Sequence, residues 1–294
     1  MISVIVPTFN RLDYLRPALD SVFAQTFDAW ELVVADDGSD VATRTHLASL
    51  TAPRGQRIER LWLPHRGSPA AVRNAALGAA RGEHVAFLDS DDLWAPRKLE
   101  EQLAALRARP DCHWCYTAFT RVDSSGVALS EERDRLWIPH QGAVFDDIAR
   151  GAAAIRTPSV MATRRLVLDA GAFDEALPSA EDYDLWMRLA LRSPVALVDE
   201  ALVFVRLHDD NLTRDWSSAF IGRDRSLRKL QSQVDPRRRA LLQRERARNA
   251  AQLAAEHAAR GDRKAAWQAL WQARSYAWPH AAWWKQLARR ALGR

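Results

Sequence analysis

The sequence predicts an α/β protein with a mainly parallel central sheet flanked by helices, followed by a C-terminal helical extension. Short apolar runs alternate with helical patterns through the first hundred residues, as expected of a parallel sheet covered by helices. From about Ser217 onward, Ala, Arg, Gln and Leu dominate and turn residues become rare, which favours helices. At 294 residues and 48% hydrophobic, the chain can bury a full core.

The expected elements follow one another in a regular order. They are a strand over 2–6, a helix over 15–23, strands over 31–35 and 58–63, an Ala-rich helix over 69–80, a strand over 84–88 and a helix that Pro96 opens. The only cysteines, Cys112 and Cys115, lie in an alternating run over 112–119 that is typical of a strand, the alternative being a redox or zinc motif.

Charge divides the chain into two predicted domains, 1–214 and 215–294. The first carries 24 basic and 31 acidic residues, and the second carries 18 basic and 6 acidic residues, so their net charges are −7 and +12. Such an asymmetry predicts different tasks for the two parts.

The N-terminus begins directly with a strand-like segment and lacks the charged leader of a signal peptide. About 18 consecutive apolar residues, the length that a bilayer-spanning helix needs, occur nowhere. The sequence therefore predicts a cytoplasmic protein, either soluble or peripheral on the inner face of the membrane.

Polar segments follow three of the predicted strands, over residues 7–11, 36–40 and 89–92. In open α/β sheets, ligands bind beyond the carboxyl ends of the strands. We therefore expect these segments to converge on one cleft.

The most acidic of these segments is Asp89-Ser90-Asp91-Asp92. Neighbouring carboxylates at the end of a buried strand repel one another unless a hard cation or several hydrogen-bond donors neutralise them. The segment predicts a metal site, and the alternative is a turn and helix cap ahead of Pro96.

The chain resembles the family 2 glycosyltransferases with the GT-A fold, over about residues 1 to 210. The segments that carry the resemblance are Ser3-Val4-Ile5-Val6-Pro7-Thr8-Phe9-Asn10-Arg11, Glu31-Leu32-Val33-Val34-Ala35-Asp36-Asp37-Gly38-Ser39, Ala71-Val72-Arg73-Asn74, Phe87-Leu88-Asp89-Ser90-Asp91-Asp92, Gly171-Ala172-Phe173-Asp174-Glu175 and Glu181-Asp182-Tyr183-Asp184-Leu185-Trp186-Met187-Arg188-Leu189.

The resemblance implies a nucleotide-sugar site at the first two strand ends. It assigns the donor base to Asp37, with Asp36 nearby, and adds Pro7, Thr8 and Asn10 as nucleotide contacts. The alternative for the segment 36–39 is an ordinary Asx turn.

The resemblance also places Arg73 and Asn74 beside the nucleotide, where the guanidinium would pair with a phosphate or with an acidic side chain. The alternative for both residues is a solvated helix face.

For the metal, the resemblance implies Mn²⁺ or Mg²⁺. Asp91 and Asp92 match the metal and ribose contacts, with Asp92 as the direct ligand and Asp89 as a supporting carboxylate. The segment 203–208 resembles the end of the family core, which makes His208 a candidate for the metal or the diphosphate, although a lone histidine has many structural uses. The ion would bridge the two phosphates and assist departure of the nucleotide.

Transfer with inversion needs a base that takes the proton of the acceptor hydroxyl. The resemblance gives this role to Asp182, with Glu181 orienting the base or touching the acceptor. The alternative is that Asp182 only caps the helix that follows it.

These assignments predict an inverting transferase that moves a sugar from a UDP- or dTDP-sugar to a glycan or lipid-linked acceptor, in cell-surface polysaccharide synthesis. A dinucleotide oxidoreductase is excluded because no Gly-x-Gly-x-x-Gly follows the first strand. A nucleotidyltransferase would share much of the architecture, but the Gly- and Lys-rich triphosphate loop is absent.

A competing hypothesis is an inactive GT-A-like protein that uses its basic tail to bind nucleic acid or a membrane. Nucleic acid is not expected, because no nucleic-acid motif accompanies the tail and an acid-lined cleft makes a poor track for a phosphate backbone.

The basic C-terminal part predicts contact with an anionic membrane that presents a lipid-linked acceptor. Six of the twelve Trp residues lie there, namely Trp216, Trp267, Trp271, Trp278, Trp283 and Trp284. The last segment adds helical spacing of Trp283, Trp284, Leu287, Ala288 and Leu292, flanked by basic residues. The alternative is that these Trp residues pack the helices onto the catalytic domain or onto a second subunit, which leaves an oligomer open.

Overall fold

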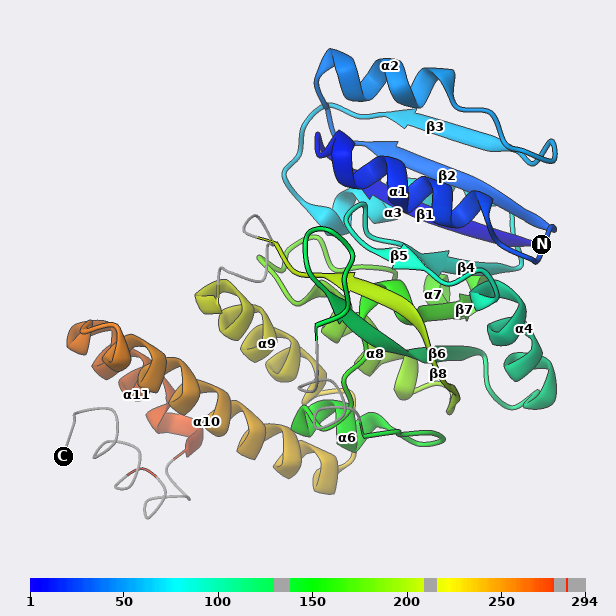
Figure 1. Ribbon diagram of the computed structural model, residues 1–294. Helices are drawn as coiled ribbons and strands as arrows, with labels where there is room; N and C mark the ends of the chain where they lie inside the picture. The colour runs from blue at the N-terminus through cyan, green and yellow to red at the C-terminus, as the bar shows by residue number, and fades with distance from the viewer. Residues whose placement is uncertain (130–137, 209–215, 278–283, 285–294) are drawn as a thin grey trace. The chain divides into compact units, whose positions relative to one another are not determined.

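The computed structural model describes residues 1–129, 138–208, 216–277 and 284, and its chain forms two compact units (Figure 1). The first unit consists of Met1–Glu175 and Leu185–Asn211, and the second of Ala176–Asp184 and Leu212–Arg294. A short segment from the middle of the chain thus belongs to the same unit as the C-terminal helices. The expected boundary between residues 214 and 215 lies outside the described residues.

The first unit is built on an eight-stranded sheet in the order β3-β2-β1-β4-β7-β6-β8-β5. Its strands are β1 (Ile2–Thr8), β2 (Trp30–Asp36), β3 (Ile58–Trp62), β4 (His84–Phe87), β5 (Leu93–Trp94), β6 (Trp114–Val122), β7 (Val160–Thr163) and β8 (Val195–Arg206). Its helices are α1 (Leu12–Phe23), α2 (Val41–Ser49), α3 (Pro69–Ala79), α4 (Lys98–Ala108), α6 (Phe145–Arg150), α7 (Arg164–Asp169) and most of α8 (Glu181–Ala190), with a short 3₁₀ turn, η1 (Thr157–Ser159).

The first half of the sheet is parallel, as the sequence predicts. β1 pairs in parallel with β2 and β4, and β2 pairs in parallel with β3. Every residue of β2 is buried, which is expected of a strand covered on both faces. Helix α1 contributes Leu15, Leu19 and Val22 to the same core, three residues that recur at helical spacing. The predicted α/β fold is therefore confirmed.

The second half of the sheet is mixed. β7 is antiparallel to both β4 and β6, whereas β8 is parallel to β6 and antiparallel to β5. The run over 112–119 enters β6 from Trp114 onward, and Cys112 precedes the strand. Both cysteines are free and buried.

The helix expected at Pro96 begins two residues later, at Lys98. Lys98 is fully buried, and its amine lies 3.6 Å from the centroid of the Trp94 ring. Burial lowers the pKa of Lys98 well below its usual range. Lysine usually lies on the solvated surface, but Lys98 is part of the core.

The second unit consists of α9 (Trp216–Leu230), α10 (Pro236–Ala259) and α11 (Arg263–Ala277), together with the segment Ala176–Asp184. Ala residues of α10 and α11 form two small apolar clusters between these helices. The helical extension is therefore confirmed. In the described part of the chain, no helix is both long and apolar enough to cross a membrane.

Candidate functional site

Three polar segments meet at one edge of the parallel half of the sheet. The last residues of β1 and β2 pair as Thr8 with Asp36, and β4 pairs with the middle of β1 through Ile5 and Phe87. Leu88 then donates its backbone N–H to the carbonyl of Ile5. The segments that follow β1, β2 and β4 are thus brought together, as predicted from the rule for open α/β sheets.

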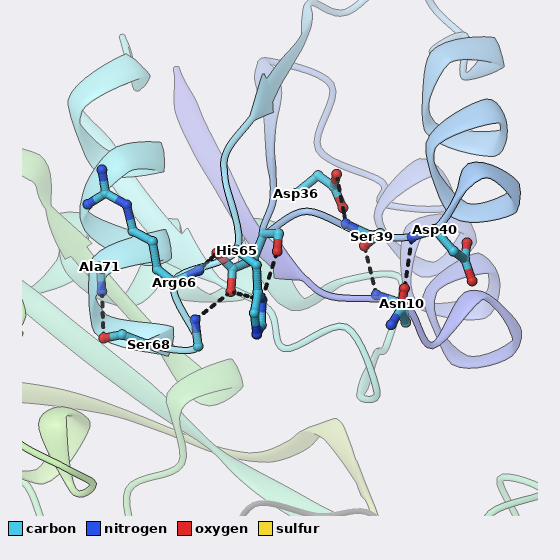
Figure 2. A network of polar contacts seen from close by, with 10 residues as sticks. Asn10, Asp36, Ser39, Asp40, His65, Arg66, Ser68 and Ala71 are labelled. Carbon is cyan, nitrogen blue, oxygen red and sulfur yellow. Dashed lines mark hydrogen bonds and ion pairs between the residues drawn. The ribbon is translucent and has the colours of Figure 1, made fainter.

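The segments after β1 and β2 are tied together by short polar contacts (Figure 2). The backbone N–H of Asn10 donates to Ser39 Oγ at 2.7 Å, and the Asn10 Oδ1 accepts from the N–H of Asp40 at 2.9 Å. Asp36 is buried and accepts from the N–H of Ser39 at 3.2 Å. Asn10 and Asp36 therefore fix the shape of the two loops.

Pro7 and Thr8, the remaining candidates at this edge, belong to β1 itself. Thr8 is buried, and its hydroxyl lies 3.5 Å from the carbonyl oxygen of Asn10.

Asp37 organises the loop that follows β3. Its Oδ1 accepts from the N–H of Arg66 at 2.8 Å, and its Oδ2 accepts from the N–H of Gly67 at 3.0 Å. Gly38 has a φ of +82°, and a Cβ on it would lie 2.9 Å from the backbone nitrogen of His65. The turn after β2 therefore requires glycine at this position.

An aromatic pair lies beside Asp37. The rings of Phe9 and His65 are stacked with centroids 4.1 Å apart, and His65 Nδ1 is 3.0 Å from the Asp37 carboxylate. Phe9 is 41% exposed, which is unusual for a phenylalanine at the end of a buried strand. Neither Phe9 nor His65 is among the site residues predicted from the sequence. The signal available was an apolar residue, Phe9, within a polar segment that follows a strand.

The carboxylates after β4 are bound by cationic side chains. Asp89 Oδ1 lies 2.7 Å from Arg73 Nη2, and Asp91 Oδ2 lies 2.6 Å from Arg11 Nη1. His208 Nε2 is 3.0 Å from the same Asp91 oxygen. Arg73 and His208 thus lie with the acidic segment, and Arg73 is buried rather than on a solvated helix face.

Asp92 is the buried carboxylate of the cluster, whereas Asp89 and Asp91 are partly exposed. It is 5% exposed, and its Oδ1 accepts from the backbone N–H of Arg206 at 2.8 Å. Burial, together with the negative charges of Asp91 and Asp89, raises the pKa of Asp92 well above its ordinary value. A cation at this position would relieve the strain of an ionised, buried carboxylate.

The carboxylate oxygens of Asp91 and Asp92 suit Mg²⁺ or Mn²⁺ in a site where other ligands complete the coordination shell. Carboxylate oxygens are the ligands that these ions prefer, and Mg²⁺ is usually held by one or two carboxylates while substrate phosphates complete its shell. No group of three or more His, Cys, Asp or Glu side chains that would hold a metal occurs among the described residues. Asp91 and Asp92 supply two carboxylates of the kind that such an ion binds.

His208 is positioned by an aromatic neighbour that is not among the site residues predicted from the sequence. Its ring stacks on Tyr14 with centroids 4.6 Å apart, and the guanidinium of Arg206 lies 5.0 Å from the centroid of Tyr14 on α1. The His208 side chain is only 3% exposed. The role of Tyr14 could not be predicted from the sequence, because Tyr14 lies on α1, one helical turn after the polar segment that follows β1.

Asn74 holds a loop of the first unit. Its Nδ2 donates to the carbonyl of Phe173 and to Glu175 Oε1, each at 2.9 Å, and its Oδ1 accepts from the N–H of Phe173 at 3.0 Å. Its amide is therefore occupied by protein groups, and contact with a nucleotide stays a prediction.

Glu181 and Asp182 open helix α8 and belong to the second unit, whereas the other candidate residues belong to the first. Ala180 precedes them with a φ of 60°. Asp182 Oδ1 accepts from the N–H of Tyr183 at 2.7 Å. Acidic residues in a first turn interact favourably with the helix dipole.

A protein-family model matches more than half of the chain. The family model described as "Glycosyl transferase family 2" matches residues 3–170.

Among curated proteins, the putative teichuronic acid biosynthesis glycosyltransferase TuaG of Bacillus subtilis is 36% identical over 131 residues, covering 45% of this chain and 51% of TuaG. The UDP-Glc:alpha-D-GlcNAc-diphosphoundecaprenol beta-1,3-glucosyltransferase WfgD of Escherichia coli is 26% identical over 199 residues, covering 68% and 73%. An uncharacterized glycosyltransferase of Rickettsia felis is 27% identical over 71% of this chain, which spans only 35% of that relative.

Solved structures of other glycosyltransferases share the fold, TarS and PcManGT among them. S. aureus TarS 1-349 in complex with UDP gives a TM-score of 0.62 at 22% identity, covering 84% of this chain and 70% of that one. The mannosyltransferase PcManGT from Pyrobaculum calidifontis, in complex with GDP-Man and Mn²⁺, gives 0.60 at 19% identity, covering 100% and 87%.

Proposed function

The chain belongs to glycosyl transferase family 2, and from this premise we propose that it is a metal-dependent, inverting glycosyltransferase. The observation that carries the proposal is that Asp37 and the Asp89–Asp92 carboxylates follow β2 and β4, the two strands that flank β1, at the same end of the parallel half of the sheet. Asp37 suits a nucleotide base, and the Asp89–Asp92 segment suits a diphosphate with its cation. The nucleotide-sugar donor would therefore lie across the strand ends between them.

The proposed donor is a UDP- or dTDP-sugar. Asp37 would accept a hydrogen bond from a base N–H, and the stacked Phe9 and His65 offer a flat surface for the ring beside it. UDP is bound by TarS and UDP-Glc appears in the name of WfgD, which supports a uridine donor.

Replacing Asp37 with alanine is expected to weaken UDP binding about tenfold or more, which corresponds to about 1.4 kcal/mol. The change removes the acceptor for the base and for the N–H groups of Arg66 and Gly67. Titration calorimetry with UDP measures the effect. Asp40→Ala is the matched control, because Asp40 caps α2 by accepting from Thr43 N–H and contacts the Asn10 side chain only through its backbone. Equal loss of affinity in both variants would contradict the assignment.

The divalent ion is proposed to bind with the donor diphosphate. Asp91 and Asp92 would hold it, with His208 beside Asp91. Mn²⁺ or Mg²⁺ supplies Lewis-acid stabilisation of the departing nucleoside diphosphate. Arg11 and Arg73 hold Asp91 and Asp89 in fixed positions, which limits the repulsion within the acidic segment.

The proposed base for the acceptor is Asp182. A carboxylate that accepts the proton of the attacking hydroxyl, on the face opposite the leaving group, gives inversion at the anomeric carbon. Glu181 would orient this base or contact the acceptor.

The proposed acceptor is a glycan or a lipid-linked glycan of cell-surface polysaccharide synthesis. The names of TuaG and WfgD, one concerned with teichuronic acid and the other with a diphosphoundecaprenol substrate, support this class.

A panel of nucleotide sugars tests the reaction. With a matching donor, Mn²⁺ or Mg²⁺ and a mixture of lipid-linked acceptors, we expect release of nucleoside diphosphate and an acceptor product with inverted configuration. The alternative, an inactive GT-A-like protein, predicts nucleotide binding by calorimetry with no release from any donor.

We further propose that the second unit contacts an anionic membrane at which such an acceptor is presented. Trp267 and Trp271 lie one turn apart on α11 and are 52% and 65% exposed, and Arg274 lies over the Trp271 ring at 4.3 Å from its centroid. Exposed Trp and Arg together are typical of membrane interfaces. The predicted Trp stripe over 283–292 lies outside the described residues, apart from Trp284, which packs on Ala residues of α10 and α11.

Co-sedimentation with anionic vesicles is expected to fall at least threefold in the Trp267→Ala/Trp271→Ala variant, because two interfacial Trp side chains are removed. Neutral vesicles should retain little of either protein. Trp62→Ala is the control, since Trp62 is also exposed, at 41%, but lies on β3. Sedimentation that is unchanged by the double substitution would contradict the membrane proposal.

A further inference from the structure

The segment that carries Glu181 and Asp182 belongs to the C-terminal helical unit. Ala176–Asp184 clusters with the helices that follow residue 212, although the rest of α8 belongs to the first unit. The contacts inside this unit therefore decide how the first turn of α8 is held.

The first contact is a buried ion pair. Asp184 is completely buried, and its Oδ1 lies 2.7 Å from Lys229 Nζ near the end of α9. An ionised carboxylate is stable in the interior only when a counter-charge or several donors accompany it. Lys229 therefore fixes the first turn of α8 two residues after Asp182.

The second contact is a close approach of two backbones. A Cβ built on Gly222, in the middle of α9, would lie 2.0 Å from the carbonyl oxygen of Ser179. No larger side chain fits without a shift of one backbone. Ala180, with its φ of 60°, follows directly, so α9 supports the strained turn that leads into Glu181 and Asp182.

A third contact lies between these two. The guanidinium of Arg223 lies 5.4 Å from the centroid of the Tyr183 ring. Helix α9 therefore contacts this segment at Ser179, before Asp182, and at Tyr183 and Asp184, after it.

Helix α9 is itself held by α10. Arg246 on α10 forms a two-pronged ion pair with Asp224, at 2.9 and 3.1 Å, and Asn249 Nδ2 donates to the carbonyl of Phe220 at 2.8 Å. Arg246 and Asn249 are both buried. The support behind the segment is thus a pair of helices rather than a single one.

We propose that α9 is the scaffold that orients Asp182, and that Lys229 and Gly222 are positioning residues for activation of the acceptor. The proposal rests on the proposed role of Asp182 as the base. It gives the C-terminal helices a task in the transfer step, in addition to any contact with a membrane.

Gly222→Ala tests the backbone contact. We expect kcat for transfer to fall about tenfold or more with the donor KM within about twofold, because small displacements of a reacting group cost that much. Amide hydrogen exchange of residues 180–184 should accelerate. Gly78→Ala is the matched control, since Gly78 is also helical, on α3, and a Cβ there meets nothing within 4 Å. It should leave kcat and the exchange unchanged.

Lys229→Met tests the ion pair independently of Gly222. We expect the same pattern of lowered kcat, near-normal donor KM and faster exchange at 180–184. Lys229→Arg should restore most of kcat, because it returns the counter-charge of Asp184. Adding Asp184→Asn to Lys229→Met should recover part of the loss, because the buried carboxylate that lost the counter-charge of Lys229 is then replaced by a neutral amide.

The two proposals fail separately. Normal exchange at 180–184 and normal kcat in both Gly222→Ala and Lys229→Met would overturn the scaffold, even if Asp182→Asn is inactive. If Asp182→Asn instead transfers sugar normally, the base assignment fails, and the exchange data alone then report whether α9 holds the segment.

Discussion

Asp182→Asn is expected to lower the rate of sugar transfer by about 10²–10⁴-fold, which is the usual contribution of a general base. The amide cannot accept the proton of the acceptor hydroxyl. Binding of the nucleotide sugar should stay within about twofold of the wild type, because the proposed base would act on the acceptor and not on the donor. Rapid-quench measurement of transfer, combined with calorimetry of donor binding, separates these effects.

Asp262→Asn is the matched control for this experiment. Asp262 also stands at the start of a helix of the second unit, where it accepts from the N–H of Ala265 at 2.9 Å. Asparagine serves at such positions about as well as aspartate, so the control should retain full activity. A transfer rate near the wild-type value in Asp182→Asn would remove Asp182 from the role of base.

Asp92→Asn is expected to have opposite effects on activity and on stability. Turnover should fall by about 10²-fold or more, because the neutral amide cannot supply the negative charge proposed to hold a divalent ion. Exhaustive chelation of the wild-type enzyme should produce a similar loss, and Mn²⁺ or Mg²⁺ should restore the wild type but not the variant. Full activity after chelation would contradict the proposed metal requirement.

The stability effect follows from the raised pKa of Asp92, which has burial as its main cause and the charges of Asp91 and Asp89 as further causes. The folded state holds the proton of this carboxyl more tightly than the unfolded chain does. Ionised Asp92 therefore destabilises the fold at pH values above its folded pKa, and the penalty disappears as the pH falls through that pKa.

Without divalent ions, Asp92→Asn should thus raise Tm at neutral pH by about 2–4 °C, the shift expected from roughly 1 kcal/mol in a protein of this size. The asparagine Oδ1 can still accept from Arg206 N–H, so the backbone contact is kept. The gain should shrink as the pH is lowered. A lower Tm in the variant at neutral pH would show that the carboxylate is well compensated in the fold.

The parallel half of the sheet and its polar edge could be predicted because their signals are local. Each strand is a short apolar run, and the rule for strand ends then brings Asp37 and Asp92 to the same edge. Contacts that depend on distant parts of the chain left no such signal. The burial of Lys98 beside Trp94, the stacking of His208 on Tyr14 and the antiparallel pairing of β7 all depend on packing that periodicity does not encode.

The residue types of the acidic segment indicated a site. The side chains that pair with its carboxylates could not be identified from the sequence. Asp89 is paired with Arg73, which lies on α3. Asp91 is paired with Arg11, the residue just before α1. Asn74 looked equivalent to Arg73 in the sequence, yet its amide binds the backbone at Phe173. Neighbouring helix positions point in different directions, and only the three-dimensional arrangement separates their tasks.

The split of α8 between the two units has a consequence for how the chain is made. Residues 176–184 leave the ribosome before the helices that they pack against in the second unit have been synthesised, because synthesis proceeds from the N-terminus. The buried carboxylate of Asp184 then lacks Lys229 until α9 has emerged. A nascent chain that ends before α9 would complete its parallel sheet while the turn before Asp182 stays unsupported, and the second unit would be the last to form.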